Sequence, residues 1–299
     1  MKIPITFLGT GQAIPTAKRN HSAILVKYKD ENILFDCGEG TQRQFRKAKI
    51  NPCKITRLLI THWHGDHVLG IPGLLQTLAL NNYNKTLYVY GPKGTSKFMD
   101  LMYKLFVYKE KIKMQVKEIS SGKVFDAQDF SVEALQMKHG APTIAYSLTE
   151  KDKKRIDKAK LKMLKIPQCK ELAKLLEGKG VIIKCRKLKP NQLVYKEKGR
   201  KISLILDTAI NPNCYKIAKT ADLLICESTY MENEAALAKE YKHLTAKQAG
   251  QIAKKAKTKK LIITHLSQRY ENKEKKLLNE AKKIFKNASI VEDLDKIEI

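Results

Sequence analysis

The chain has few acidic residues, no closely paired cysteines and no long apolar segment, and each absence excludes a class of protein. Its 299 residues include six scattered cysteines with no CxxC pair, which excludes a zinc ribbon and is typical of reduced thiols in a cytosol-like compartment. No apolar run approaches the ~18 residues of a membrane span. The opening MKIPITFLGTGQ lacks the features of a signal peptide. We therefore expect a cytoplasmic protein without a membrane partner.

Basic residues outnumber acidic ones by 58 to 30, which gives a net charge of +28. Repulsion between like charges on this scale destabilises a compact state, so a polyanionic partner is the natural explanation. A general lysine bias of the proteome is the alternative, and charge alone does not separate the two.

Eleven short apolar runs, each bounded by Gly, Asn, Asp or Pro, predict β-strands. They lie at 3–9, 21–28, 32–36, 55–61, 86–91, 130–138, 143–148, 201–207, 221–227, 259–265 and 288–293. Helical patterns alternate with several of them, at 68–82, 94–108 and 244–257. The mixture predicts an α/β fold in which helices cover sheets, with polar strand ends gathered at one rim.

Residues 151–200 have a different composition from the rest of the chain. They hold eighteen Lys or Arg and five Asp or Glu, a surplus of +13. Two stretches, 151–165 and 168–180, predict helices with only a weak apolar stripe. We interpret 150–200 as a basic arm inserted into, and projecting from, a single domain of residues 1–299. A solvated helical pair without a ligand is the alternative.

The segment THWHGDH, Thr61 to His67, follows an apolar strand and precedes a helix, and it holds three of the seven histidines. His62 and His64 can converge on one ion, while Asp66 and the adjacent His67 can serve a neighbouring ion. Imidazole and carboxylate donors together suit zinc, with manganese or iron possible.

Three more polar residues directly follow buried-looking strands, and each is a candidate ligand. His139, Asp207 and His265 end the runs FSVEALQMKH, KISLILD and KKLIITH. Each taken alone could be a polar strand cap. Beside THWHGDH, they supply the roughly three protein ligands that each metal of a pair needs.

The HxHxDH pattern, followed by an isolated His, an Asp-Thr and a late Thr-His, resembles the metallo-β-lactamase superfamily. Further segments resemble its tRNA 3′-processing endoribonucleases, the tRNase Z family. These are FLGTGQAIP, LFDCGEGTQRQ, THWHGDHVLGIPGLL, GAPTIAYSL, ESTYMENEAALAKEYKHLTAKQAGQIA and ITHLSQRY. The resemblance covers roughly 1–95, 130–149 and 200–299.

This resemblance implies an αβ/βα sandwich with a dinuclear zinc site at its edge. One zinc would be bound by His62, His64 and His139, and the other by Asp66, His67 and His265, with Asp207 bridging. Asp36 would orient a ligand histidine without binding metal itself. In the family, Glu227 and His243 pair, which implies that His243 is a general acid held by the carboxylate, while Asp66 orients the nucleophile or takes its proton.

The implied reaction cleaves precursor tRNA 3′ of the discriminator base, leaving a 3′-hydroxyl on the tRNA and a 5′-phosphate on the trailer. The resemblance also implies two zinc ions per subunit, a homodimer and a tRNA-binding arm at 150–200. Predicted RNA contacts are Lys18, Arg19, Lys153, Lys154, Arg155, Lys158 and Lys162. The loop Pro-Thr-Ala-Lys-Arg-Asn at 15–20 departs from the family pattern Pro-x-Lys-x-Arg-Asn, with Lys18 displaced by one position.

Two other functions remain open from the residues alone. A phosphodiesterase of the same fold, acting on small esters or cyclic nucleotides, explains the metal ligands but not the charge or the basic arm. A basic RNA-binding protein with a structural metal explains the charge, but structural zinc sites close with four ligands and seldom keep seven in two clusters.

Overall fold

The structure is a computed structural model that describes residues 2–108, 112–183 and 186–299. It falls into two compact units. The first comprises Met1–Asp126, Val132–Leu148 and Lys201–Ile299, and the second comprises Ala127–Ser131 and Thr149–Arg200.

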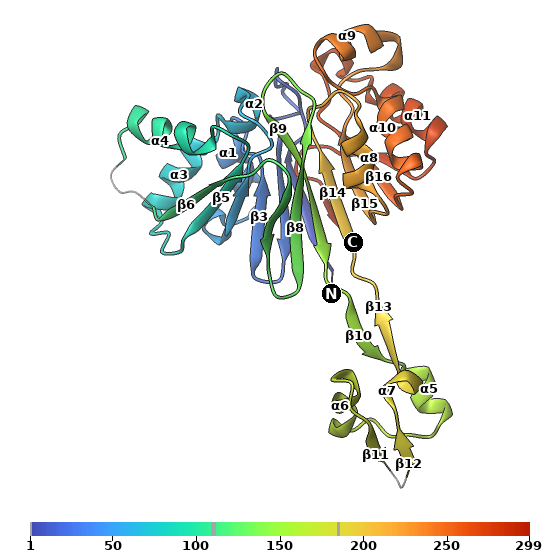
Figure 1. Cartoon of the computed structure of the whole chain (residues 1–299). Coiled ribbons are helices and arrows are strands. Elements are labelled where there is room, and N and C mark those ends of the chain that lie inside the picture. Colours follow the sequence, from blue (N-terminus) through green and yellow to red (C-terminus); the bar gives the residue numbers. More distant parts are fainter. Residues whose placement is uncertain (1, 109–111, 184–185) are drawn as a thin grey trace. The chain divides into compact units, whose positions relative to one another are not determined.

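The first unit contains two seven-stranded sheets, labelled in Figure 1. One sheet has the order β18-β1-β2-β3-β4-β5-β6. Its strands are β1 Pro4–Gly9, β2 Ala23–Tyr28, β3 Glu31–Phe35, β4 Arg57–Leu59, β5 Leu87–Gly91, β6 Met114–Glu118 and β18 Lys296–Glu298. From β3 to β6 all neighbours are parallel, so their carboxyl ends meet at one rim.

The other sheet has the order β17-β16-β15-β14-β9-β8-β7. Its strands are β7 Gly122–Asp126, β8 Phe130–Met137, β9 Thr143–Glu150, β14 Lys201–Ile205, β15 Leu223–Glu227, β16 Lys260–Thr264 and β17 Ala288–Ile290. Neighbours from β14 to β17 are again parallel. Each of the eleven predicted runs contains a strand. The predicted runs do not include β6 and β7, which lie within 86–130. Both strands are half-exposed or exposed along most of their length, so they carry no long apolar signal.

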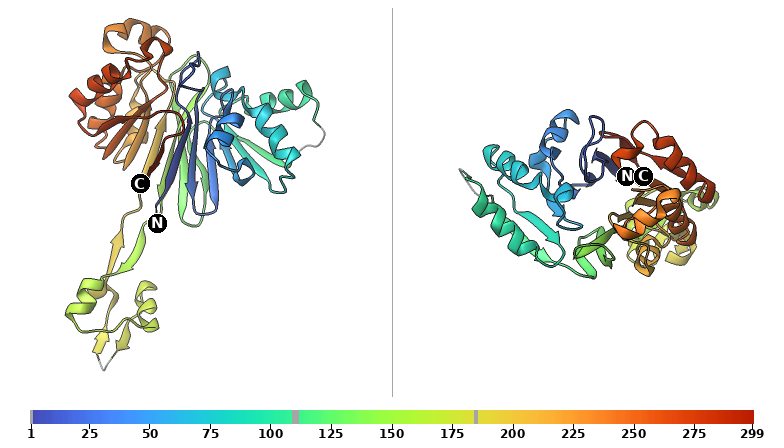
Figure 2. Two further views of the ribbon diagram at one scale, coloured as in Figure 1. Left: turned by 180° about the vertical axis from the view of Figure 1, so that it is seen from behind. Right: turned by 90° about the horizontal axis from the view of Figure 1, so that it is seen from above.

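Helices cover the outer faces of the two sheets, as the view from above in Figure 2 shows. They are α1 Thr41–Lys47, α2 Gly65–Val68, α3 Ile71–Leu80, α4 Thr95–Leu105, α8 Pro212–Ala218, α9 Ala235–Glu240, α10 Ala246–Lys255 and α11 Glu274–Ile284, with 3₁₀ turns at Pro52–Lys54, Glu232–Glu234 and Gln268–Tyr270. Helix α10 begins where it does because Thr245 and Gln248 form a capping box.

The inner faces of the two sheets pack on each other and hold the site loop in place. The rings of Phe35 and Tyr146 meet edge to face with centroids 5.7 Å apart. The Tyr146 hydroxyl donates to the Ile60 carbonyl at 2.7 Å, and the Ile144 amide donates to the Thr61 carbonyl at 3.0 Å. The second sheet therefore fixes the backbone at the start of THWHGDH.

The second unit has its own small core. Its elements are β10 Lys153–Ile156, α5 Lys158–Met163, the 3₁₀ turn Lys170–Leu172, α6 Ala173–Leu176, β11 Val181–Ile183, β12 Arg186–Leu188, α7 Pro190–Leu193 and β13 Val194–Glu197. Strand β10 pairs with β13 and β11 with β12. Eight buried aliphatic side chains form the core: Leu161, Ile166, Leu172, Leu175, Val181, Ile183, Leu188 and Leu193.

The expectation of a helix over 151–165 was partly wrong. The side chain of Asp157 accepts a hydrogen bond from the Lys160 amide at 3.0 Å and caps the helix there, so α5 starts at Lys158 and the preceding residues form a strand. The apolar stripe over 151–165 is weak because its apolar residues are divided among several short elements. Among the described residues, none of the helices combines the length and apolar character that a membrane crossing requires.

Candidate metal centre

The THWHGDH segment links the end of β4 to α2 and contributes four of the predicted ligands. His62 and His67 are fully buried, and Asp66 is 9% exposed. His64 stands at the N-cap of α2 in extended conformation, so its side chain leaves the helix while those of Asp66 and His67 lie within its first turns. Because the backbone changes from extended to helical at this point, the four donor side chains of the segment can be directed at two different cation sites.

The remaining three predicted ligands come from the ends of strands in the second sheet. His139 follows β8, Asp207 follows β14 and His265 follows β16. Asp207 and His265 have positive φ angles of 29° and 57°, which is uncommon for residues other than glycine and is a form of strain concentrated at functional sites. The chain leaves the sheet sharply at these positions and turns the side chains toward the rim.

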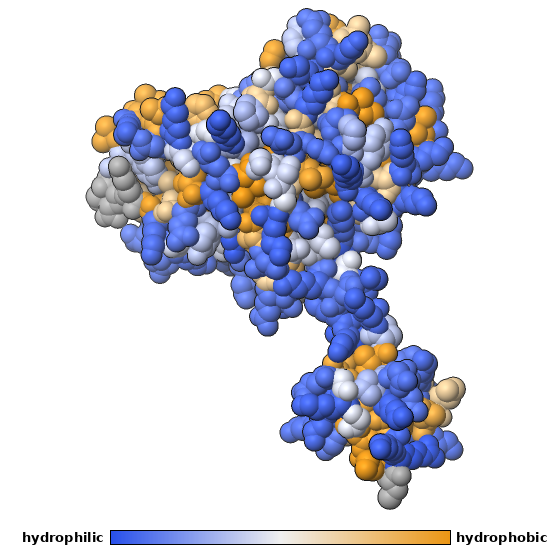
Figure 3. Space-filling view, in the orientation of Figure 1, coloured by the Kyte–Doolittle hydropathy of each residue, from blue (hydrophilic) through white to orange (hydrophobic). Residues whose placement is uncertain are grey.

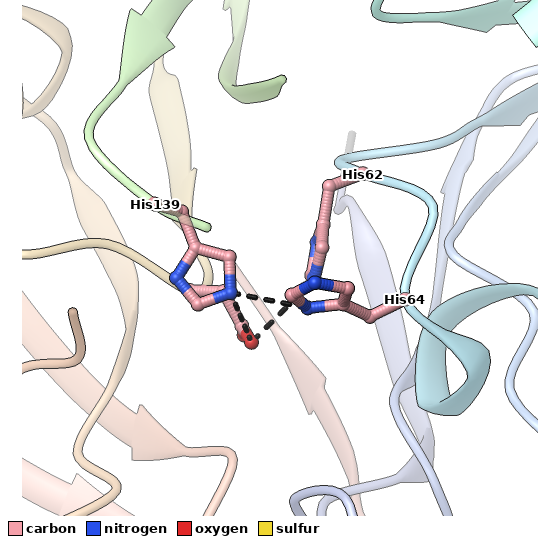
Figure 4. Close-up of side chains that lie close together, drawn as sticks. His62, His64 and His139 are labelled. Carbon is pink, nitrogen blue, oxygen red and sulfur yellow. Dashed lines mark hydrogen bonds and ion pairs between the residues drawn. The ribbon is translucent and has the colours of Figure 1, made fainter. Parts of the chain in front are cut away.

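The structure brings all seven predicted ligands together in two groups that share Asp207. One group is His62, His64, His139 and Asp207, and the other is Asp66, His67, Asp207 and His265; within each, the donor atoms lie within 4.8 Å of one another. Figure 4 shows His62, His64 and His139 converging from two separate segments. His139 Nε2 lies 3.2 Å from His64 Nδ1.

Asp207 offers one oxygen to each group. Its Oδ1 lies 3.4 Å from His67 Nε2 and 3.1 Å from His265 Nε2. Its Oδ2 lies 3.6 Å from His62 Nε2 and 3.7 Å from His139 Nε2. A carboxylate placed in this way can contribute to two cation sites at once.

Hydrogen bonds at Nδ1 leave the Nε2 atoms of four histidines for the centre. His67 Nδ1 donates to Asp36 Oδ2 at 2.7 Å, and His139 Nδ1 donates to the Lys242 carbonyl at 3.0 Å. His62 Nδ1 and His265 Nδ1 lie 3.1 and 3.0 Å from the hydroxyls of Thr61 and Thr229. This outer set of partners is how proteins orient metal-binding imidazoles.

Four inner atoms of the centre have no hydrogen-bond partner among the described residues. They are the buried Nε2 atoms of His62, His67 and His265 and the Oδ1 atom of Asp207. Buried polar atoms left in this state are costly unless something else satisfies them. A divalent cation fits both groups, because each offers imidazole nitrogen and carboxylate oxygen at one point.

The pKa shifts within the centre show how strongly the carboxylates attract positive charge. Burial opposes the charged form of His67, but Asp207, Asp66 and Asp36 outweigh burial and hold its pKa well above the ordinary value. Burial likewise opposes ionisation of Asp207, yet the surrounding histidines keep its pKa well below the usual range. Burial lowers the pKa of His62. The field that attracts a proton to His67 equally favours a metal cation.

Asp36 lies one residue after β3, fully buried, with a positive φ of 54°. Besides His67, it accepts hydrogen bonds from the amide and the hydroxyl of Thr61, both at 2.7 Å. Asp36 is outside both donor groups. Its contacts hold His67 and, through Thr61, His62.

Glu227, the last residue of β15, and His243, in the turn before α10, meet beside the centre. His243 Nδ1 lies 3.1 Å from Glu227 Oε2. Burial lowers the pKa of His243, but Glu227 and then Asp207 outweigh it and raise that pKa to about 9. The two carboxylates therefore favour the protonated, positively charged form of His243.

Sequence reasoning missed two threonines that organise these contacts. Thr229 donates its hydroxyl proton to Glu227 Oε2 at 2.7 Å and lies against His265 Nδ1. Thr61 has the same position between Asp36 and His62. The available signal was position alone, because each threonine lies two residues after the end of a strand, β4 or β15, that leads into the site.

The predicted RNA contacts of the 15–20 loop have different environments. Lys18 is exposed and donates to Asn272 Oδ1 at 2.9 Å. Arg19 is only 7% exposed, and its guanidinium donates to the Thr10 hydroxyl at 2.7 Å and the Val291 carbonyl at 2.8 Å. The side chain of Arg19 thus anchors the loop and does not present its charge to solvent.

The seventh histidine was not predicted to have a role. His21 is 7% exposed, and its Nε2 lies 3.1 Å from the Ala13 carbonyl in the same loop. A Cβ on Gly38 would lie 2.4 Å from both the His21 Cβ and the Asp66 carbonyl oxygen. His21 therefore packs directly behind the segment that carries Asp66.

The other predicted contacts lie in the second unit. Lys154, Lys158 and Lys162 are exposed, and Lys153 is half-buried. Arg155 is exposed and pairs with Glu197 at 2.7 Å.

Known proteins resemble the chain over its full length. Ribonuclease Z of Methanosarcina acetivorans is 35% identical over 297 residues, covering 99% of this chain and 97% of that protein. Ribonuclease Z of Enterococcus faecalis is 38% identical over 305 residues, with 99% and 97% covered. A family model described as anti-Pycsar protein Apyc1 matches residues 3–156.

Solved structures agree with these relatives. Human tRNase Z, short form, superposes with a TM-score of 0.73 at 29% identity over 98% of both chains. The metallo-β-lactamase fold protein YhfI of Bacillus subtilis has a TM-score of 0.73 at 18% identity, covering 100% of this chain and 99% of that one, and supports the fold alone. The predicted α/β sandwich is confirmed. The chain belongs to the ribonuclease Z family and is a hydrolytic endoribonuclease with the metallo-β-lactamase fold.

Proposed function

We propose that the chain is a zinc-dependent endoribonuclease that cuts precursor tRNA 3′ of the discriminator base. The observation that carries this proposal is the pair of donor groups sharing Asp207, in a chain similar over its whole length to ribonuclease Z. The products would be a tRNA with a 3′-hydroxyl and a trailer with a 5′-phosphate.

The donor set supports two zinc ions per subunit. His62, His64 and His139 would hold one ion, Asp66, His67 and His265 would hold the other, and Asp207 would contribute to both. Manganese and iron accept similar donors, so metal analysis of the purified protein has to accompany every assay. Zinc ions bound there would supply Lewis acidity that lowers the pKa of water and offsets the charge on the phosphate.

The residues of the chain then perform two proton steps. The nucleophilic water loses a proton as its oxygen forms a bond to phosphorus, and Asp66, whose pKa is kept low by His67 and His265 despite burial, is placed to orient that water or take the proton. His243, charged and held by Glu227, donates a proton to the departing 3′ oxygen. The phosphorus–oxygen bond breaks, and the phosphate stays on the trailer.

The basic surplus supports tRNA as the partner. Lysine and arginine side chains neutralise phosphates and release counterions, which supplies most of the affinity in binding that does not read sequence. Residues 150–200 hold nearly half of the surplus charge, and we assign them as the tRNA-binding arm. Lys18 and the exposed basic residues of the arm are the proposed contacts.

We also propose a homodimer in the cytoplasm. Figure 3 shows hydrophobic side chains gathered over α4, where Leu101 and Leu105 are 47% and 75% exposed. They line a cavity of 450 Å³ together with Trp63, Phe98, Met102 and Lys104. Replacing Leu101 and Leu105 by Glu is expected to give a monomer by sedimentation; an unchanged mass would place the interface elsewhere.

The described cysteines are free thiols, which supports a reducing compartment.

The deciding experiment is cleavage of a 3′-extended precursor tRNA by metal-loaded protein, with Asp66→Ala beside it and the product ends mapped. One cut after the discriminator, abolished in the variant, is expected. Hydrolysis of a small phosphodiester without any cut in tRNA would favour the phosphodiesterase function instead. Tight RNA binding without cleavage by the parent protein would favour a binding protein with a structural metal.

A further inference from the structure

Residues 151–200, which form most of the second unit, contain one aromatic residue, and that residue is on the surface. Tyr195 is the only Phe, Tyr or Trp between 151 and 200, and it is 50% exposed. The buried core of this unit is entirely aliphatic. An aromatic side chain normally contributes a large apolar area to a core, so its place outside a core that lacks aromatics indicates a different use.

The register of the β10–β13 ribbon places Tyr195 beside basic side chains. Arg155 lies directly opposite Tyr195, and Lys153 lies opposite Glu197. Because side chains alternate along a strand, these four share one face of the ribbon. Exposed aromatic and basic side chains interleaved on a two-stranded surface are the usual means of binding unpaired nucleotides.

The Arg155 guanidinium is held in position on this face. Its Nε donates to Glu197 Oε2 at 2.7 Å, across the ribbon and next to the tyrosine ring. A planar guanidinium fixed in this way can itself stack on a base, and RNA-binding proteins use both aromatic rings and arginine planes for that purpose.

A hollow of 600 Å³ opens at this face, lined by Arg155, Ile156, Asp157, Lys158, Tyr195 and Glu197. Its walls carry both signs of charge. The carboxylates of Asp157 and Glu197 disfavour a phosphate inside the hollow, whereas the exocyclic amino groups of adenine, cytosine and guanine can donate to them. Lys158, which also lines the hollow, can bind the backbone phosphate of the same nucleotide.

We propose that Tyr195 and Arg155 form a stacking platform for one unpaired base of the RNA substrate. This inference rests on the proposed function for the identity of the RNA and adds a contact to the base rather than to the phosphates. The stacking itself tolerates any sequence, since every base has a face that can stack, whereas the two carboxylates favour a base with an exocyclic amino group.

The test uses the whole protein and equilibrium binding of a tRNA that ends at its discriminator base, so that nothing remains to be cut. Tyr195→Ala should weaken binding roughly fivefold to a hundredfold, the range for loss of one aromatic–base stack. Tyr195→Phe keeps the ring and should bind within about twofold of the parent protein. Ile182→Ala, which removes another exposed apolar side chain of the same unit (70% exposed), is the matched control and should change nothing.

The salt dependence of the affinity distinguishes the loss of a stacked base from the loss of a phosphate contact and from unfolding of the second unit. Tyr195→Ala should keep the slope of log affinity against log salt, because no phosphate contact is lost, whereas Lys154→Ala should reduce it by about 0.7 to 0.9. Unchanged binding in Tyr195→Ala, equal loss in Tyr195→Phe, or a reduced slope in Tyr195→Ala would each overturn the platform. Binding that depends on the ring in a protein that cuts no tRNA would support the platform and remove the proposed function. No binding by the parent protein would remove both.

Discussion

Charged side chains have opposite arrangements in the two units. At the rim of the first unit, Asp36 is buried against His67, and Asp207 is buried among four histidines. In the second unit most charges are exposed and of one sign, and even the paired Lys196 and Lys198, both near Asp152, have side chains that are 65% and 81% exposed.

This difference in burial predicts that the first unit controls the chemical step and that the second unit controls the affinity for RNA. Removing one buried charged group leaves its partners unpaired in the protein interior, which screens charge poorly, and this costs much free energy. An exposed ion pair contributes about 0–1 kcal/mol and is weakened by salt. Substitutions at the rim should therefore change turnover and metal content, whereas substitutions in the second unit should change affinity and its dependence on salt.

The largest effect is expected for Asp207→Ala, because this one carboxylate faces four histidines in both groups. Cleavage of precursor tRNA and hydrolysis of a small phosphodiester should both fall by about a thousandfold or more, the scale of several kcal/mol of lost charge stabilisation. Elemental analysis should show lost metal. Asp100→Ala, at an exposed position on α4, is the control. Full metal content with normal cleavage would remove Asp207 from the centre.

His243→Ala should lower turnover on precursor tRNA by about a hundredfold to ten-thousandfold, the usual contribution of a proton-transfer group. Metal content should stay at the parent level if the ions occupy only the two groups that share Asp207, because His243 belongs to neither and groups instead with Glu227 and His265. Loss of zinc in this variant would instead place His243 among the ligands. Single-turnover rates, measured alongside elemental analysis, distinguish the two.

The Glu227–His243 pair also predicts the alkaline limit of activity. As the proposed general acid, His243 acts while it is protonated, so its pKa, raised to about 9, should sustain turnover until the pH rises through that value. Glu227→Gln removes the first of the interactions that raise the pKa, so the alkaline limb should move to lower pH. The pH profile of kcat for the two proteins checks this, and an unmoved limb would mean that another group sets it.

Asp36→Asn tests how far the outer partners matter. The amide is nearly isosteric but loses the negative charge beside His67, and substitutions at such positions typically cost tenfold to a hundredfold in metal affinity. Competition with a chelator measures that affinity. The control is Thr56→Val, at a hydroxyl that donates to the Glu31 carboxylate and accepts from the Asn32 amide, with no contact to the donor groups; it should leave the affinity unchanged. Equal loss in both variants would indicate a general effect on stability.

The parts of this molecule that sequence reasoning predicted are those with local signals. Every expected strand was found because its pattern of apolar residues, continuous or alternating, can be read from a few neighbouring residues. The strand ends after β8, β14 and β16 indicated His139, Asp207 and His265 without a structure. Pairing Glu227 with His243 required the family resemblance, since they are sixteen positions apart and the helix α9 lies between them.

The features that were missed depend on contacts between distant segments. Arg19 reads as a basic loop residue, yet Thr10 and Val291 bury its guanidinium, and nothing in the local sequence announces those partners. The core of the second unit escaped notice because its apolar residues are distributed over short helices and hairpins, which have no common periodicity. Thr61 and Thr229 act through hydrogen bonds that only the assembled rim creates.

The smallest effect per residue is expected in the second unit, where several lysines have to be replaced together before a change in affinity can be measured. Replacing Lys153, Lys154, Lys158 and Lys162 by Ala should raise KM for precursor tRNA about tenfold at moderate salt and flatten its salt dependence, while hydrolysis of a small phosphodiester stays unchanged. The matched control removes the same charge from α10, α11 and the residues that follow: Lys254, Lys282, Lys283 and Lys286, all exposed. If both variants lost affinity equally, net charge rather than the arm would be the cause. Equal loss on the small ester would show that the arm is needed for the chemistry itself, and the division between the two units would fail.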